Sequence, residues 1–147
     1  MTELCGFLYN TCYGGFCLSN LVLELYNKKK KEEDPNFKMM KDGLCSELNL
    51  PIYRSDPVLI QIFDEIEKHQ FQHSCSRIEK KMIEKKYIDF VVISEYDGLE
   101  NIKIDFNKYY VFHIKQILSS SSNNDEKVNA INTLFLETNE ITLGTYV

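Results

Sequence analysis

Tryptophan is absent from the 147 residues of this chain, and Arg54 and Arg77 are the only arginines among its 17 basic residues. Arginine can bind a phosphate or a carboxylate through two parallel hydrogen bonds, whereas lysine offers a single point of charge. The scarcity of arginine therefore makes these two side chains the first candidates for binding an anionic group.

An excess of positive charge is also missing. The formal net charge is -5 and the isoelectric point is about 5.2. A nucleic-acid-binding domain is normally basic, with lysine and arginine clustered on one face. We therefore exclude a general nucleic-acid-binding function and expect no nucleic acid among the partners.

Long apolar runs and paired cysteines are absent as well. No apolar run approaches the roughly 20 residues of a membrane-spanning helix, and the N-terminus lacks the basic-then-apolar order of a secretory signal. The five cysteines are odd in number and include no C-x-x-C pair, which is typical of free thiols in a reducing compartment. We expect an intracellular protein that does not enter a membrane.

The residues that are present suit a globular core, since 44% are hydrophobic and 27% are charged. The apolar segment Leu4–Tyr9 predicts a buried strand that ends before Gly14 and Gly15. Ser19 is placed to act as the N-cap of a helix over residues 20–30. The first part of the chain thus predicts a strand, a glycine-containing turn and a helix.

The middle of the chain predicts a loop followed by a second helix. Residues 32–49 carry charges without a sustained period, which favours a solvated loop with a short helical turn at residues 37–41. Asp56 followed by Pro57 is a strong helix start, with aspartate as the N-cap. We expect this helix to span residues 57–68.

A hairpin follows the second helix. Residues 87–93 are aromatic and β-branched, as in a strand, and Asp97-Gly98 is a typical two-residue hairpin turn. The charged residues 78–83 fit either a helix or a strand. We expect a three-stranded antiparallel arrangement here.

The C-terminal part predicts two further helices. Apolar residues between positions 109 and 118 form the first, a serine-rich linker covers residues 119–124, and Asp125 can cap the second. Residues 140–147 suit a further strand or a loose tail. The predicted fold is α+β: a small, mainly antiparallel sheet packed on two helices in residues 1–104, and a helical extension in residues 105–147 packed on or next to that core.

Three segments together resemble a known family. They are YNTCYGGFCLS, IYRSDPVLIQIFDEI and YIDFVVISEYDGLENI, and they resemble, in this order, a small uncharacterised family of bacteriophages and large DNA viruses with the motifs N-x-C-Y-G-G-F-x-L-S, R-x-D-P and E-Y-D-G-x-E. The resemblance covers residues 4–104. The segment HQFQHSCS replaces the family's usual glycine-containing turn, and the residues after Asn107 are an addition.

The resemblance implies an origin rather than an activity. The lysine-rich, arginine-poor composition favours a giant virus over a phage. A protein of this origin would act in the host cytoplasm, and a place in the virion is compatible with the sequence.

The glycine pair offers one candidate site. Gly14 and Gly15 lie between a strand and a helix, where exposed backbone N–H groups and the positive helix end favour an anion. The loop lacks the G-x-x-x-x-G-K-[ST] pattern of phosphate-binding loops. The competing interpretation, which we rank first, is a tight turn that requires glycine for its backbone conformation.

Arg54 has two interpretations of equal weight. It can bind a phosphate or carboxylate at the start of the second helix, or it can form an internal ion pair with a carboxylate such as Glu95 or Asp97. For Asp56, the capping role is the stronger interpretation.

The acidic cluster Glu95, Asp97 and Glu100 could hold Mg²⁺ or perform acid–base chemistry. Asp-Gly is also the sequence that a hairpin turn requires, and exposed carboxylates beside such a turn are common. We assign no catalytic residue and rank a hydrolase last among the functions.

Thiols and imidazoles provide a third group of candidates. His69 and His73 would share one helical face, and Cys75 is a further zinc-type ligand. A fourth ligand at suitable spacing is missing, so we predict no metal and no other cofactor. Cys12 has no histidine nearby in sequence, which favours a buried thiol over a nucleophile.

These observations favour a non-enzymatic viral accessory protein that binds a nucleotide-like, phosphate-bearing ligand or a host protein, in one version to counter host defence. Gly14 and Gly15 would donate backbone hydrogen bonds, Arg54 would supply charge, and Tyr13 or Tyr96 would stack on a base. The alternative is a structural or assembly protein of the virus, in which aromatics of the C-terminal extension join copies into a homo-oligomer.

Overall fold

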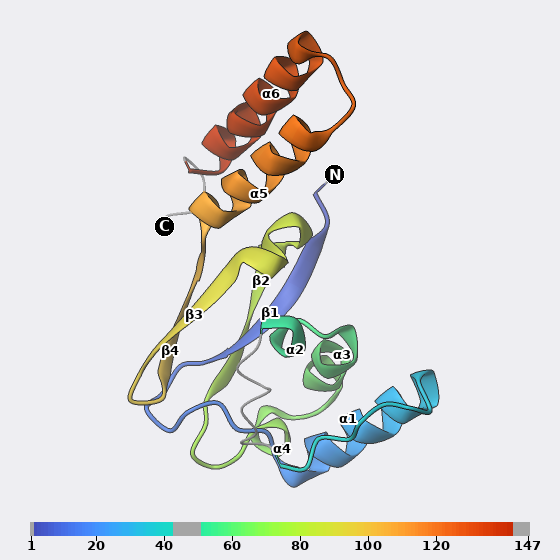
Figure 1. Ribbon diagram of the computed structural model, residues 1–147. Coiled ribbons are helices and arrows are strands. Elements are labelled where there is room, and N and C mark those ends of the chain that lie inside the picture. The colour runs from blue at the N-terminus through green and yellow to red at the C-terminus, as the bar shows by residue number, and fades with distance from the viewer. Residues whose placement is uncertain (1, 43–50, 143–147) are drawn as a thin grey trace. The chain divides into compact units, whose positions relative to one another are not determined.

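The computed structural model describes residues 2–42 and 51–142 of the chain. It divides into two compact units, Met1–Ile104 and Asp105–Val147, whose elements are labelled in Figure 1. The α+β fold class is confirmed, with helices and small antiparallel sheets in the first unit and a helical second unit.

Two separate two-stranded antiparallel sheets make up the β structure of the described residues. In the first, β1 (Leu4–Asn10) pairs with β2 (Ile78–Glu84), in a register that sets Asn10 opposite Ile78. In the second, β3 (Val91–Tyr96) pairs with β4 (Leu99–Ile104) across the turn at residues 97–98. The ambiguous segment at residues 78–83 is therefore a strand.

The expected three-stranded arrangement is wrong. Residues 87–90 do not extend β3, because Lys85–Phe90 forms a 3-10 helix, η2. The side chain of Tyr87 in η2 is almost completely buried. This 3-10 helix therefore contributes a side chain to the interior, and it also connects β2 of the first sheet to β3 of the second. Its aromatic residues resembled a strand because strands and buried turns share the same residue types.

Helix α1 (Asn20–Glu33) begins where the sequence predicts. The Ser19 hydroxyl accepts a hydrogen bond from the backbone N–H of Val22 at 3.2 Å, so Ser19 is the N-cap. The helix continues three residues beyond the expected end at residue 30, and its last turn carries Lys30 and Lys31. Lysines at this end complement the negative pole of the helix.

The segment after α1 packs against it instead of forming the expected solvated loop. Asn27 and Met40 exchange two hydrogen bonds of 2.9 Å between the asparagine amide and the methionine backbone. The ring of Phe37 contacts Tyr26 edge to face at 5.9 Å. No helical turn forms at residues 37–41, and residues 43–50 of the expected loop lie outside the described part.

Three short helices follow: α2 (Pro51–Arg54), α3 (Pro57–Glu65) and α4 (Lys68–Phe71). Asp56 caps α3 by accepting from the N–H of Val58 at 2.8 Å. The helix ends earlier than expected because Ile66 is extended. The chain changes direction at Ile66, between α3 and α4. The fully buried Phe71 of α4 then lies in the core, with its ring centroid 4.9 Å from that of Phe63.

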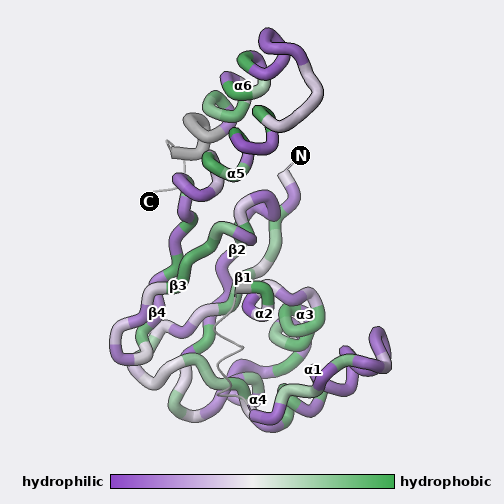
Figure 2. The backbone as a smooth tube through the Cα atoms, viewed as in Figure 1, coloured by the Kyte–Doolittle hydropathy of each residue, from purple (hydrophilic) through white to green (hydrophobic). Residues whose placement is uncertain are grey.

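The hydrophobic core of the first unit is formed by β1, β2, α1, the segment after α1, α3, α4 and the end of the glycine-containing loop. Figure 2 shows the hydrophobic stretch of α3 among these elements. Its buried members are Leu8, Phe16, Leu18, Val22, Leu23, Tyr26, Met40, Val58, Leu59, Ile62, Phe71 and Ile78.

The second unit is a pair of helices, α5 (Phe106–Ser119) and α6 (Asn124–Thr142). Asp105 caps α5 by accepting from the N–H of Lys108 at 3.0 Å. The start of α6 is capped by Asn123 and Glu126, each accepting from the backbone N–H of the other. The expected cap at Asp125 is therefore wrong.

The end of the chain was expected to form a strand or a loose tail. Helix α6 extends to Thr142, and residues 143–147 lie outside the described part. Among the described helices, none combines the length and the apolar character that crossing a bilayer demands.

Candidate functional site

The glycine-containing loop and the β3–β4 turn meet around one buried side chain, Asn10. Its amide nitrogen donates to the carbonyls of Cys12 and Gly98 at 2.6 and 2.7 Å, and its oxygen accepts from the N–H of Arg77 at 2.8 Å. Both donors of the amide are used, and the side chain is fully buried. Asn10 therefore holds three segments of the chain in a fixed arrangement.

Glycine is required where these segments touch. At Gly98, φ is +85° and an added Cβ would lie 2.5 Å from the carbonyl oxygen of Tyr13. At Gly14, an added Cβ would lie 1.4 Å from the carbonyl oxygen of Cys75. Gly15 has φ +81°, with open space around the Cβ position. The tight-turn interpretation fits Gly15, whereas Gly14 is needed for close contact with a distant segment.

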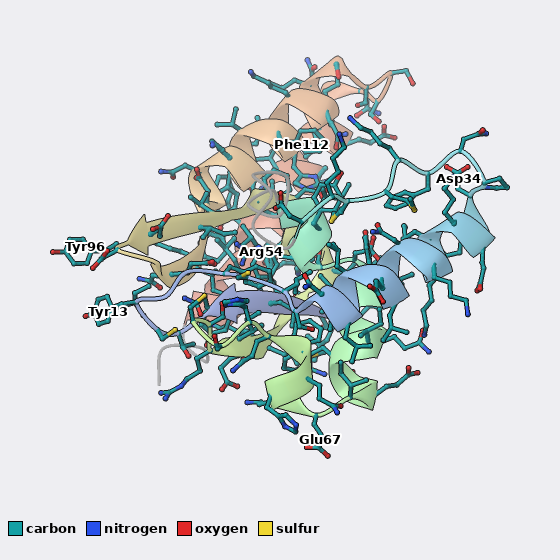
Figure 3. All side chains as sticks on the ribbon, turned by 90° about the horizontal axis from the view of Figure 1, so that it is seen from below. Tyr13, Asp34, Arg54, Glu67, Tyr96 and Phe112 are labelled. Atoms are coloured by element: carbon teal, nitrogen blue, oxygen red, sulfur yellow. The ribbon has the colours of Figure 1, made fainter. Side chains whose placement is uncertain are left out.

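Arg54 is fully buried and bound inside the first unit. Its guanidinium forms two parallel hydrogen bonds to the carboxylate of Glu100, at 2.8 and 2.9 Å, and a third to the carbonyl of Leu8 at 3.2 Å. Its central carbon lies 3.5 Å from the centroid of the Phe16 ring. Arg54 thus forms an internal ion pair, and its side chain does not face the solvent (Figure 3).

The carboxylate that pairs with Arg54 is Glu100, and not either of the two examples that the sequence suggested. Glu95 and Asp97 are exposed at the turn, whereas Glu100 on β4 is buried. Burial lowers the pKa of the Arg54 guanidinium, and the hydrogen bonds that the guanidinium donates to Glu100 oppose that shift. The side chain stays charged because the ordinary pKa of arginine lies so far above neutrality.

The three carboxylates of the predicted acidic cluster have separate structural roles. Glu100 binds Arg54, and Glu95 accepts from the N–H of Gly98 at 2.7 Å. Asp97 occupies the turn with φ +49°, which a type I′ turn requires and which aspartate tolerates. Among the described residues, these three carboxylates are not part of a group close enough together to hold a metal ion.

Tyr13 and Tyr96 are the two large aromatic side chains at the meeting point of the loop and the turn. Their exposed fractions are 64% and 77%. Figure 3 shows both rings pointing outward on the same side of the first unit. Beside Tyr96, the hairpin is hollowed into an open groove of about 600 Å³, lined by Ser94, Glu95, Tyr96, Leu99, Glu100 and Asn101.

A second feature of this region is a cluster of Cys17, His73 and Cys75. Their ligand atoms, two Sγ and one ring nitrogen, all lie within 4.8 Å of one another. Burial, and next the neighbouring Cys75, raise the pKa of the Cys17 thiol. His69 is not part of the cluster, because α4 ends at Phe71 and the two histidines do not share a helix.

The sequence reasoning missed Cys17 as a companion of His73 and Cys75. The two segments are more than fifty residues apart, and no local spacing joins them. Cys12 was expected to be a buried thiol but is only partly buried, and its Sγ lies 3.2 Å from the carbonyl oxygen of Cys75. The signal that the sequence offers is the gathering of thiols and imidazoles in two short segments, residues 12–17 and 69–75.

Comparison with protein-family models, with curated proteins and with solved structures finds no match to this chain.

Proposed function

We propose that this protein is a non-enzymatic accessory protein of a large DNA virus, acting in the infected cell, and that it binds a basic segment of a host protein. The binding surface is the tyrosine tip, which we define as Tyr13, Glu95, Tyr96 and Asp97. The exposure of two tyrosines on rigidly joined loops is the observation that carries this proposal.

Exposed tyrosines supply large contact areas at a low cost in side-chain entropy, and tyrosine is enriched at the energetic centres of interfaces. Here the loops that carry Tyr13 and Tyr96 are fixed to each other through Asn10 and Gly98. Because these loops are already ordered, binding would cost little conformational entropy. A larger part of the contact energy would then contribute to the affinity than for a surface on flexible loops.

The charge of the tip favours a basic partner. Glu95 and Asp97 are exposed beside Tyr96, and the chain has a formal net charge of -5. A lysine or arginine of a partner could lie over a tyrosine ring and pair with a neighbouring carboxylate. A nucleotide-like ligand is less well supported, because Arg54 is buried and bound to Glu100.

The test is a selection from a displayed peptide library with the full chain, followed by counter-selection with the double variant Tyr13→Ala/Tyr96→Ala. We expect the selected peptides to be rich in lysine and arginine and to lose at least about tenfold in affinity for the double variant, or about 1.4 kcal/mol. Met82→Ala is the matched control, since Met82 is also exposed, on β2. Equal binding to wild type and double variant would refute the proposal.

Calorimetry with mono-, di- and cyclic nucleotides separates the two ligand classes. If a nucleotide gives a binding heat with wild type and none with the double variant, the ligand of the tyrosine tip is a nucleotide and not a basic segment. If no nucleotide gives a binding heat, the nucleotide is rejected as a ligand, and the peptide selection alone decides the function of the tyrosine tip.

An assembly role is the second candidate, favoured by exposed apolar side chains on the second unit. Light scattering should then show a large species for the full chain and a monomer for residues 1–104. A monomeric full chain would refute it. The exposed apolar residues of α5 and α6 are Val111, Phe112, Leu118, Val128, Phe135 and Leu136.

A further inference from the structure

Cys17, His73 and Cys75 form a compact cluster of metal-binding atoms that the proposed function does not use. The ring Nδ1 of His73 lies 3.1 Å from the Sγ of Cys75, and the Sγ of Cys17 completes a group whose atoms lie within 4.8 Å of one another. In a tetrahedral site with zinc–sulfur and zinc–nitrogen distances of about 2.3 and 2.0–2.1 Å, ligand atoms lie roughly 3.3–3.8 Å apart. The three atoms are therefore close enough for small side-chain adjustments to bring them around one ion.

The backbone holds the two ligand-bearing segments together. The N–H of His73 donates to the carbonyl of Cys17 at 2.9 Å, and the N–H of Cys17 donates to the hydroxyl of Ser76 at 3.0 Å. The Ser76 hydroxyl in turn donates to the carbonyl of Gly15 at 2.7 Å. Because these contacts do not involve the ligand atoms, the cluster is positioned by the fold before any ion binds.

The imidazole presents Nδ1 to the cluster. The backbone N–H of Cys75 lies 3.3 Å from Nδ1 of His73, and an ion bound to Nδ1 would take the place of this long hydrogen bond. A ring nitrogen with a lone pair is the form of imidazole that binds a metal. The same nitrogen faces the sulfur of Cys75, so the donor atoms converge.

We propose that Cys17, His73 and Cys75 bind one Zn²⁺ through two thiolates and the Nδ1 of imidazole. Two sulfurs and one nitrogen suit zinc, whereas calcium and magnesium prefer oxygen ligands. Two thiolates balance the charge of the ion. Because the cluster of described residues offers three ligands and both His73 and Cys75 are exposed, a water molecule would take the fourth position.

A zinc ion here would join the glycine-containing loop to the turn at residues 73–76. An ion that binds the folded state and not the unfolded state stabilises the folded state by mass action. The gain is about 2.7 kcal/mol at a free zinc concentration one hundred times the dissociation constant. The site is independent of the tyrosine tip, since none of its ligands belongs to that surface.

The experiment measures metal content and affinity on the full chain under a phosphine reductant. Mass spectrometry should find one zinc per chain after incubation with zinc and desalting, and added Co²⁺ should produce thiolate-to-metal charge-transfer absorption. Cys75→Ser and His73→Ala should each weaken zinc binding by more than the roughly 10–100-fold that loss of an outer-shell partner costs.

The matched controls are Cys5→Ser and His69→Ala, which remove a thiol and an imidazole outside the cluster and should leave zinc affinity unchanged. Cys17 is buried, so if Cys17→Ser fails to fold, the exposed ligands His73 and Cys75 decide the outcome. The proposal is overturned if wild type retains no zinc, if the controls lose as much affinity as the ligand variants, or if Cys17 and Cys75 form a disulfide despite the reductant.

Discussion

At the scale of single residues, this protein depends on polar side chains that are buried with their partners. Arg54 and Asn10 are both fully buried, and each makes at least three hydrogen bonds. A buried polar group is tolerated when it is satisfied and becomes costly when a partner is removed. Replacing the partner of a buried polar side chain should therefore change the free energy of unfolding more than replacing an exposed charged residue.

The ion pair between Arg54 and Glu100 gives the first prediction. Glu100→Gln keeps the shape of the side chain but removes its charge, which leaves the guanidinium uncompensated. We expect the free energy of unfolding to fall by about 3 kcal/mol, as for other broken buried ion pairs. Urea unfolding monitored by circular dichroism measures the change.

Glu67→Gln is the control for this substitution. Glu67 is exposed at the start of α4 and makes no capping hydrogen bond through its side chain. Its replacement should change the free energy of unfolding by less than about 0.5 kcal/mol. Equal midpoints for the two variants would contradict the structural role of the Arg54 ion pair.

Tyr26 gives a prediction on pH dependence. Its hydroxyl donates to Asp56 at 2.9 Å, and burial, followed by the charge of Asp56, raises its pKa above the ordinary value of 10.0. The folded state thus holds this proton more tightly than the unfolded state. The resulting stability is complete below pH 10 and is lost as the pH rises above that value.

We therefore expect Tyr26→Phe to lose about 1 kcal/mol at neutral pH, from the hydrogen bond, and to show a shallower loss of stability in alkali than wild type. Urea unfolding between pH 7 and about pH 11 measures both quantities. Tyr13→Phe is the control, because Tyr13 is exposed and should leave the alkaline slope unchanged. Identical slopes for wild type and Tyr26→Phe would be evidence against a raised pKa.

At the scale of elements, the position of the glycine-containing loop is set by its contact with the turn at residues 73–76. The close approach of Gly14 to the carbonyl of Cys75 brings the loop near enough for Ser76 to bind the carbonyl of Gly15. The same approach brings the thiol of Cys12 to the carbonyl of Cys75. Side-chain volume at position 14 therefore controls how two distant segments fit together.

Gly14→Ala and Gly15→Ala should consequently differ in cost. At position 15, alanine suffers only from the positive φ, which costs about 1–2 kcal/mol. At position 14, the methyl group collides with a backbone carbonyl, and the turn must move, with loss of its hydrogen bonds. We expect the thermal midpoint to fall further for Gly14→Ala, and the reverse order would contradict the close contact.

At the scale of the whole molecule, the buried hydrophobic core lies entirely within the first unit. Every residue of that core has a number below 80, whereas the buried hydrophobic residues of the second unit among the described positions are Tyr109 and Leu134. A pair of helices with so little burial gains little stability by itself, because most helical stability comes from tertiary packing.

We predict that residues 1–104 fold without the second unit. The truncated chain should show a cooperative urea transition with a midpoint close to that of the full chain, measured by near-ultraviolet circular dichroism of its buried tyrosines. Residues 105–147 alone should unfold without a cooperative transition. A truncated first unit that lacks fixed tertiary structure would show that the extension is needed for folding.

The sequence by itself determined the features whose causes lie within a few residues. Ser19 and Asp56 cap their helices because each side chain reaches a backbone N–H of the following turn. Asp97-Gly98 forms the hairpin turn because both residues tolerate positive φ. The α+β class follows from the same local preferences, since strand-like and helix-like segments differ in periodicity and composition.

Only the tertiary structure decided which distant residues meet. Arg54 pairs with Glu100, 46 positions away, and Cys17 meets His73 and Cys75 because the loop after β1 lies against the segment that precedes β2. These pairings depend on the register of β1 with β2 and on which side chains the core buries. Both are properties of the whole packed unit, so no short stretch of sequence contains them.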